Sequence, residues 1–155
     1  VTMNASRLSL AELYETDFNL WLEQTIQLLK TKQFQHLDLA HLIEELEGLG
    51  KRDKRELQSR LTTLFEHALK RKYVISPGDY RSWEETIVRE QRELYILLKN
   101  SPSLKRFWEE IIRDCYEDAL KFLKKLPDYR NNPFPETYPF PTDPDQLLNQ
   151  SFWEE

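Results

Sequence analysis

The stretch DLAHLIEELEGLGKRDKREL, residues 38–57, decides the fold class, because its apolar residues recur three and four positions apart. Its first half carries one apolar stripe: Leu39, Leu42, Ile43 and Leu46. This spacing has the period of an α-helix. Gly48 and Gly50 follow the stripe, and both can take the positive φ of a helix C-cap. The pattern therefore predicts a helix near 38–48, a break, and a new helix that begins near residue 51.

The rest of the chain repeats the helical period, and only three of its 155 residues are glycine. Working outward from the opening stretch, helices are predicted near residues 17–32, 51–73, 83–99 and 103–126. The first of these carries the stripe Phe18, Trp21, Leu22, Thr25, Ile26 and Leu29. Each predicted helix has an apolar side and a polar side. We therefore expect an all-α, single-domain bundle of about five helices around one shared core.

The chain changes character after residue 126. Five prolines fall between Pro133 and Pro144, interleaved with the aromatic residues Phe134, Tyr138 and Phe140. Our preferred interpretation is a bundle over residues 1–126 and an extended segment over 127–155 that packs on it through these aromatics, within the same domain. A proline-rich ligand for a partner is the alternative. Asp143-Pro144 predicts a short final helix.

Charge and composition narrow the class of function. Residues 1–50 carry eight acids against three bases, and residues 51–72 carry eight bases against three acids. The formal net charge of the chain is −5, which argues against binding to nucleic acids or anionic membranes. No apolar run approaches the roughly 20 residues that span a bilayer. A single cysteine, Cys115, excludes an internal disulfide, so we expect a cytoplasmic protein.

The acidic block offers a weak metal signal. Glu44 and Glu45 point away from the apolar stripe on a helical wheel, whereas Glu47 lies at its edge. Glu44 and Glu47 are neighbours at i,i+3 and could share a cation if other ligands completed the shell. The basic residues that follow are distributed around their helix rather than along one groove-reading face, which again disfavours nucleic-acid binding.

A more specific candidate site involves Glu90. This residue replaces an apolar member of the stripe in the helix near 83–99, so it should point toward the core and need a partner there. Arg60, His67 and Glu47 are the candidates. In the structural interpretation, which we prefer, Glu90 pairs with arginine or histidine and fixes the helix register. In the functional one, Glu47, His67 and Glu90, with Glu44 as a further ligand, form a site for a divalent metal or for acid–base catalysis.

Several of these pieces together resemble one known family. The segments LYETDFNLWLEQTIQLLK, LDLAHLIEELEGLGKRDKRELQSRL, LFEHALK, RSWEETIVREQRE and FPETYPFPTDPDQLL resemble the bacterial domain-of-unknown-function family 29, from Leu13 onward. The resemblance implies a compact all-helical fold and no assigned activity.

No complete catalytic motif is present, and no cofactor is expected. We therefore expect a non-catalytic helical protein of the bacterial cytoplasm that interacts with another protein, in a regulatory or antitoxin-like role. The alternative is a metal-dependent hydrolase or nuclease that uses Glu47, His67 and Glu90.

Overall fold

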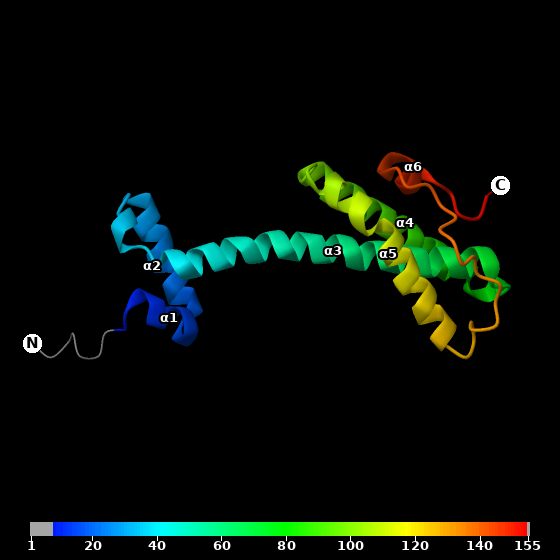
Figure 1. Ribbon diagram of the computed structural model, residues 1–155, viewed down its shortest axis with the longest axis horizontal. Coiled ribbons are helices and arrows are strands. Elements are labelled where there is room, and N and C mark those ends of the chain that lie inside the picture. Colours follow the sequence, from blue (N-terminus) through cyan, green and yellow to red (C-terminus); the bar gives the residue numbers. More distant parts are fainter. Residues whose placement is uncertain (1–7, 155) are drawn as a thin grey trace, which may run out of the picture. The chain divides into compact units, whose positions relative to one another are not determined.

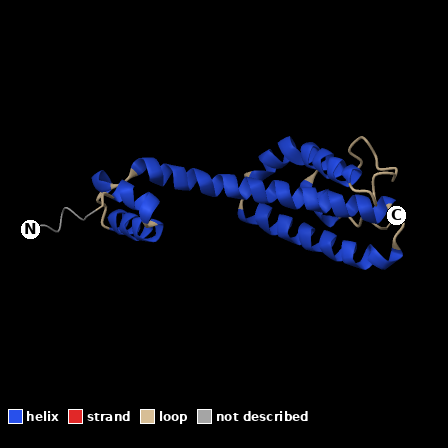
Figure 2. Cartoon of the chain, turned by 90° about the horizontal axis from the view of Figure 1, so that it is seen from below, coloured by secondary structure: helices blue, strands red, loops and turns tan. Residues whose placement is uncertain are grey.

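The computed structural model describes residues 8–154, and every regular element in that range is helical (Figure 1, Figure 2). In chain order the elements are α1 (Leu10–Thr16), α2 (Phe18–Lys30), the 3-10 turn η2 (Phe34–His36), α3 (Leu39–Tyr73), α4 (Pro77–Asn100), α5 (Leu104–Lys125) and α6 (Pro144–Asn149). The predicted all-α fold with five substantial helices is confirmed. Residues 1–7, the beginning of the predicted bundle, lie outside the described residues.

The chain divides into two compact units between Lys51 and Arg52. Unit 1 is described over residues 8–51 and contains α1, α2, η2 and the beginning of α3. Unit 2 is described over residues 52–154 and contains the rest of α3 with α4, α5 and α6. No helix among residues 8–154 is both long enough and apolar enough to cross a membrane.

The predicted break at Gly48 and Gly50 is wrong, because α3 runs without interruption from Leu39 to Tyr73. Neither glycine takes a positive φ, so neither acts as a C-cap. A glycine inside a helix costs only about 1 kcal/mol relative to alanine. The good helix formers on both sides outweigh that cost.

Helix α4 also begins earlier than predicted, at Pro77 rather than near residue 83. Ser76 occupies the N-cap position, and Pro77 stands in the first turn, where a missing N–H leaves no hydrogen bond unmade. Asp143 caps α6 as expected, since its side chain accepts a hydrogen bond from the backbone N–H of Gln146 at 3.1 Å.

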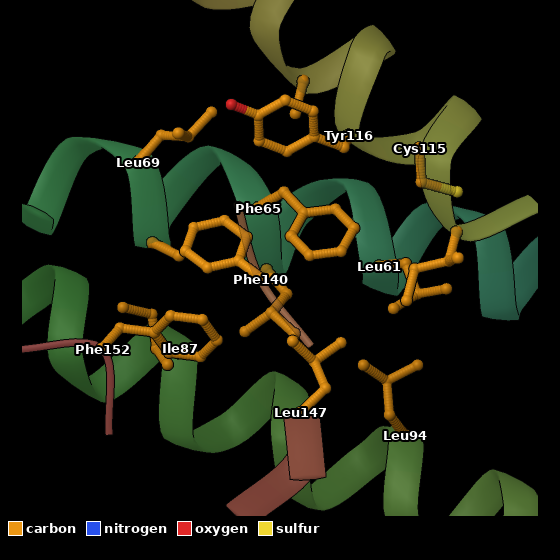
Figure 3. Packing of buried hydrophobic residues seen from close by; sticks show 14 of the residues in the cluster. Leu61, Phe65, Leu69, Ile87, Leu94, Cys115, Tyr116, Phe140, Leu147 and Phe152 are labelled. Carbon is orange, nitrogen blue, oxygen red and sulfur yellow. The ribbon is translucent and has the colours of Figure 1, made fainter. Parts of the chain in front are cut away.

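Unit 2 contains the large hydrophobic core. Side chains from α3, α4 and α5 meet in it, and Figure 3 shows Leu61, Phe65 and Leu94 among the residues that fill it. All three are fully buried. The apolar stripes predicted for these three helices therefore do face one core.

The proline-rich segment completes this core. Four of its apolar side chains are buried there: Phe134, Phe140, Leu147 and Phe152. Gln91 of α4 holds α6 (Pro144–Asn149) and the residue after it, because its Nε2 donates hydrogen bonds to the carbonyls of Leu147 at 3.0 Å and Gln150 at 2.8 Å. Trp108 of α5 donates from its indole N–H to the carbonyl of Thr142 at 2.8 Å. These contacts leave the aromatic residues Phe134 and Phe140 facing inward rather than toward a partner.

Candidate interaction surface

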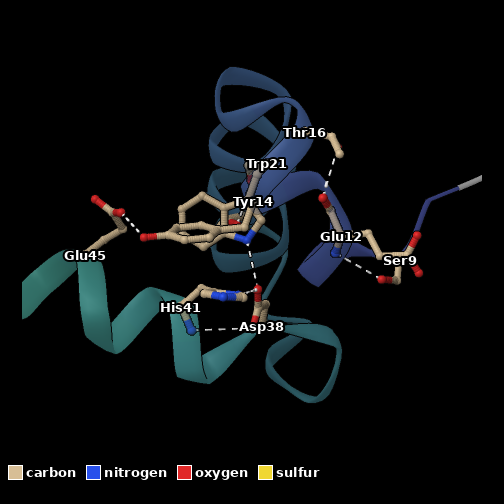
Figure 4. Close-up of polar contacts among 9 residues, drawn as sticks. Ser9, Glu12, Tyr14, Thr16, Trp21, Asp38, His41 and Glu45 are labelled. Carbon is tan, nitrogen blue, oxygen red and sulfur yellow. Dashed lines mark hydrogen bonds and ion pairs between the residues drawn. The ribbon is translucent and has the colours of Figure 1, made fainter.

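A polar and aromatic cluster holds the helices of unit 1 together (Figure 4). Asp38, just before α3, accepts a hydrogen bond from the indole N–H of Trp21 at 3.1 Å and lies 2.6 Å from Nδ1 of His41. The ring of Tyr14 stacks on that of His41, with centroids 3.9 Å apart and planes 14° apart. The Tyr14 hydroxyl donates to the carboxylate of Glu45. These hydrogen bonds and the stacked rings connect α1, α2 and the beginning of α3.

The protonation states of this cluster follow from its contacts. Burial alone would raise the pKa of Asp38, but hydrogen bonds from His41 and Trp21 outweigh it and leave that pKa below its ordinary value. The hydrogen bond to Glu45, followed by burial, raises the pKa of Tyr14 to about 12. At neutral pH the cluster therefore contains a carboxylate at Asp38 and a neutral phenol at Tyr14. The polar groups of the cluster form hydrogen bonds with one another. We therefore assign the cluster a structural role, in which it stabilises unit 1.

Outside this cluster, unit 1 exposes an apolar stripe along α2. Its four members are between 39% and 44% exposed: Phe18, Leu22, Ile26 and Leu29. They recur at steps of four, four and three residues and so share one side of the helix. The same helix buries Trp21 and Thr25 instead. The expectation that the whole predicted stripe enters the core is therefore wrong for these four side chains.

A second apolar stripe lies on the first turns of α3. Its four members are between 51% and 58% exposed: Leu39, Ile43, Leu46 and Leu49. Three of these come from the stretch that was expected to form a core stripe. We call the four exposed residues of α2 and these four of α3 the apolar surface of unit 1.

Unit 1 is too small to cover this surface. Leu13, Trp21 and Thr25 are its only buried side chains among residues 8–51. Domains of about 40 residues rarely bury a sufficient core without a disulfide, a metal or a partner. The exposed area of these residues is on the order of 300 Å² on α2 and 400 Å² on α3, and the largest apolar patches of soluble proteins, which reach about this size, are often functional.

The residues of the predicted metal or catalytic site are divided between the two units. Glu44 and Glu47 belong to unit 1 and are exposed, whereas His67 and Glu90 belong to unit 2. Within residues 8–154, no group of three His, Cys, Asp or Glu side chains has the spacing to hold a metal ion.

Glu90 instead makes the arginine pair of the structural interpretation. Its carboxylate lies 3.2 Å from Nη1 of Arg60, and its side chain is 12% exposed. Arg60 also contacts Glu56, one turn earlier on α3, at 3.0 Å. Burial alone would lower the pKa of Arg60, but the hydrogen bonds to Glu56 and Glu90 raise it above its ordinary value. The pair links α3 to α4 and engages the Glu90 carboxylate as the structural interpretation expects.

Two other titratable side chains of unit 2, His67 and Cys115, are partly or fully buried. Nδ1 of His67 lies 2.8 Å from the carbonyl of Thr63, which can only accept, so Nδ1 carries the proton. Burial lowers the pKa of His67 and raises that of the Cys115 thiol to about 11. Cys115 therefore remains a thiol at neutral pH and is a poor nucleophile.

Sequence reasoning missed the cluster around Tyr14, Asp38 and His41. An aspartate directly before a helical stripe, as Asp38 stands before Leu39, is an N-terminal signal that could have placed His41 in its first turn. The stacking of Tyr14 on His41 depends on tertiary structure and has no sequence signature.

Comparison with known proteins gives one assignment. No curated protein and no solved structure matches the chain significantly. A family model described as a domain of unknown function, DUF29, matches residues 13–153. The resemblance seen in the sequence is thereby confirmed, and the chain belongs to the DUF29 family.

Proposed function

We propose that this protein is a non-catalytic interaction protein of the bacterial cytoplasm, which binds another protein in a regulatory or antitoxin-like role. The binding site is the apolar surface of unit 1. The single cysteine, Cys115, is in keeping with a reducing compartment.

The observation that carries the proposal is the exposure of two helical stripes in a unit with almost no core. Burying the apolar part of this area in a complex would contribute about 25 cal/mol per Å². Association costs an estimated 4–15 kcal/mol in lost freedom of motion. Exposed apolar stripes of this size are favourable places for a partner to bind, and their exposure in water without one is unfavourable.

The metal-dependent hydrolase built on Glu47, His67 and Glu90 has no comparable support. Glu90 is paired with Arg60, His67 with a backbone carbonyl, and Glu47 lies in the other unit. No observation on the described residues favours that activity over the interaction.

Native mass spectrometry tests the proposal on the chain purified from a bacterial host that contains it naturally, without chelators. We expect a stoichiometric complex with a second, different protein. The exchange Leu46→Ser should abolish this complex, and Lys121→Ser, at an exposed site on α5, should leave it intact. A bare chain that carries a divalent ion, lost in Glu90→Ala, would support the hydrolase and contradict the proposal.

A further inference from the structure

We propose that the outward side of α4 binds an acidic, amphipathic segment of a protein partner. This surface belongs to unit 2, so the inference stands apart from the binding site proposed on unit 1. It depends on a groove along α4, on the charges that line this groove and on the apolar side chains between them.

A groove of about 730 Å³ runs along α4 between Pro77 and Arg92. Three arginines line it, together with the aromatic ring of Tyr80 and the aliphatic side chain of Val88. Binding pockets of proteins have volumes of roughly 300–1,000 Å³. The groove is therefore large enough to hold side chains of a partner against both the arginines and the apolar groups.

Contacts with α3 and the residue after it fix one wall of the groove. The Tyr80 hydroxyl donates to the carbonyl of Val74 at 3.1 Å, and the guanidinium of Arg71 lies 3.9 Å from the centre of the Tyr80 ring. Arg71 also donates to the carboxylate of Glu84 at 3.1 Å. The charge of Glu84 is thus matched by an arginine of α3, which leaves the arginines of α4 to set the sign of the groove.

The cationic character continues along the whole outward side of α4. Eight residues follow this side over about five turns, and all are exposed: Arg81, Glu85, Val88, Arg89, Arg92, Tyr95, Ile96 and Lys99. Six of them recur at alternating steps of four and three residues. Arg89 and Ile96 each lie four residues beyond a member of that line, so all eight share one side of the helix. Four bases against one acid give this side a net charge of +3.

Ion pairs within the protein offset only part of this charge. The guanidinium of Arg81 lies 3.5 Å from Glu85, and that of Arg92 lies 3.8 Å from Glu93. Both arginine side chains are highly exposed, at 93% and 68%, so these pairs are weak. Arg89 forms no ion pair with another residue of the range 8–154.

Apolar side chains interrupt the charges on the same side. Val88 is 54% exposed, Tyr95 56% and Ile96 42%. Apolar contacts with these residues would supply affinity, and the charges beside them would select the partner. Arginine binds carboxylates through paired hydrogen bonds. A segment that carries carboxylates beside apolar side chains therefore satisfies both features of the surface.

The other anionic occupants fit less well. Nucleic acids and anionic membranes would approach a chain whose net charge is −5, which opposes their binding at long range. A phosphate backbone also has no apolar side chains to cover Val88 and Ile96. A second copy that paired through the same side of α4 would set one charge of +3 against another. An acidic protein segment meets none of these objections.

Two synthetic helical peptides test this inference with the full chain. Both carry the same leucine stripe, and the flanking positions are all glutamate in one peptide and all lysine in the other. Fluorescence anisotropy should give a dissociation constant about tenfold lower for the glutamate peptide at low salt, and the difference should shrink as salt is added.

Variants assign the effect to α4. Arg89→Gln with Arg92→Gln should remove most of the difference between the peptides. Lys121→Gln with Lys125→Gln, at exposed sites on α5, changes the net charge equally and should preserve it. Val88→Ser with Ile96→Ser should weaken binding of the glutamate peptide. All these side chains are exposed, so circular dichroism should show unchanged folding in each variant.

The opposite outcomes overturn the inference. If both peptides bind equally, or if the preference survives Arg89→Gln with Arg92→Gln, α4 does not select an acidic segment. If neither peptide binds, the surface is not a docking site for such a segment. If only a DNA oligonucleotide binds and the double exchange removes it, the partner is a nucleic acid. Leu46→Ser should leave the glutamate peptide bound, so a failure of the site on unit 1 is distinguishable from a failure of this one.

Discussion

Replacing Phe140 tests whether the proline-rich segment is part of the core of unit 2. The Phe140 ring is 6% exposed, stacks on Phe65 with centroids 5.7 Å apart, and meets Phe152 edge-on at 5.1 Å. The exchange Phe140→Ala removes nearly all of a buried ring and leaves a cavity, so it should lower the free energy of unfolding by about 3–5 kcal/mol. In a chain of this size each kcal/mol shifts the Tm by about 2–4 °C, so Tm should fall by about 10 °C.

Phe122→Ala is the matched control, because Phe122 lies on α5 of the same unit and is 49% exposed. This exchange should change the free energy of unfolding by no more than about 1 kcal/mol. Urea unfolding of both variants, followed by circular dichroism, gives the comparison. Equal and small effects would refute the assignment of Phe140 to the core and would return the segment to the role of a free proline-rich ligand.

Three further predictions concern α3 and its contacts. Glu90→Leu should keep or raise Tm, because the Arg60 side chain is 29% exposed and can stay hydrated without its partner. Burial lowers the pKa of His67 below its unfolded value of about 6.5. Near and below pH 6.5 the folded chain therefore binds fewer protons than the unfolded chain. The stability that is present above about pH 6.5 is consequently lost as pH falls. His67→Gln should flatten that loss in urea titrations between about pH 7.5 and pH 5. Gly48→Ala and Gly50→Ala should each stabilise α3 by about 0.5–1 kcal/mol, because a Cβ at either position meets nothing within 4 Å.

Each of these has an opposite result that counts against its reasoning. A fall in Tm of about 10 °C in Glu90→Leu would mean that the Arg60 guanidinium is left in an enclosed place without a partner. An unchanged pH profile in His67→Gln would remove this residue from the acid sensitivity of the fold. Destabilisation by either glycine exchange would indicate positive φ and hence the helix break that the sequence pattern predicts.

The helices of unit 2 were predictable because their apolar periodicity is long and each stripe enters a common core. The continuity of α3 was not predictable from the pattern. A glycine pair is compatible with a C-cap and with a helix interior, and only the surrounding helix formers decide between them. Sequence periodicity also reports that a helix has an apolar side without reporting what covers that side. Leu46 is an example, since its place in a stripe is equally suited to a core and to an interface.

The candidate site was predictable in part. The position of Glu90 within an apolar register indicated that it needs a partner, and Arg60 was among the candidates. Periodicity could not show that Glu47 belongs to a different compact unit from His67 and Glu90. The pairing of Tyr14 with His41 and Glu45 joins residues about 30 positions apart and required the structure.

The most direct test of the account is site-specific photocrosslinking in living bacteria, with the crosslinking residue placed at Leu46 and, as a control, at Lys121 on α5. We predict that Leu46 gives one defined product whose mass equals the chain plus a different protein, and that Lys121 does not give it. A product at Leu46 with twice the mass of the chain, or no product specific to Leu46, would contradict the claim that another protein covers the apolar surface of unit 1.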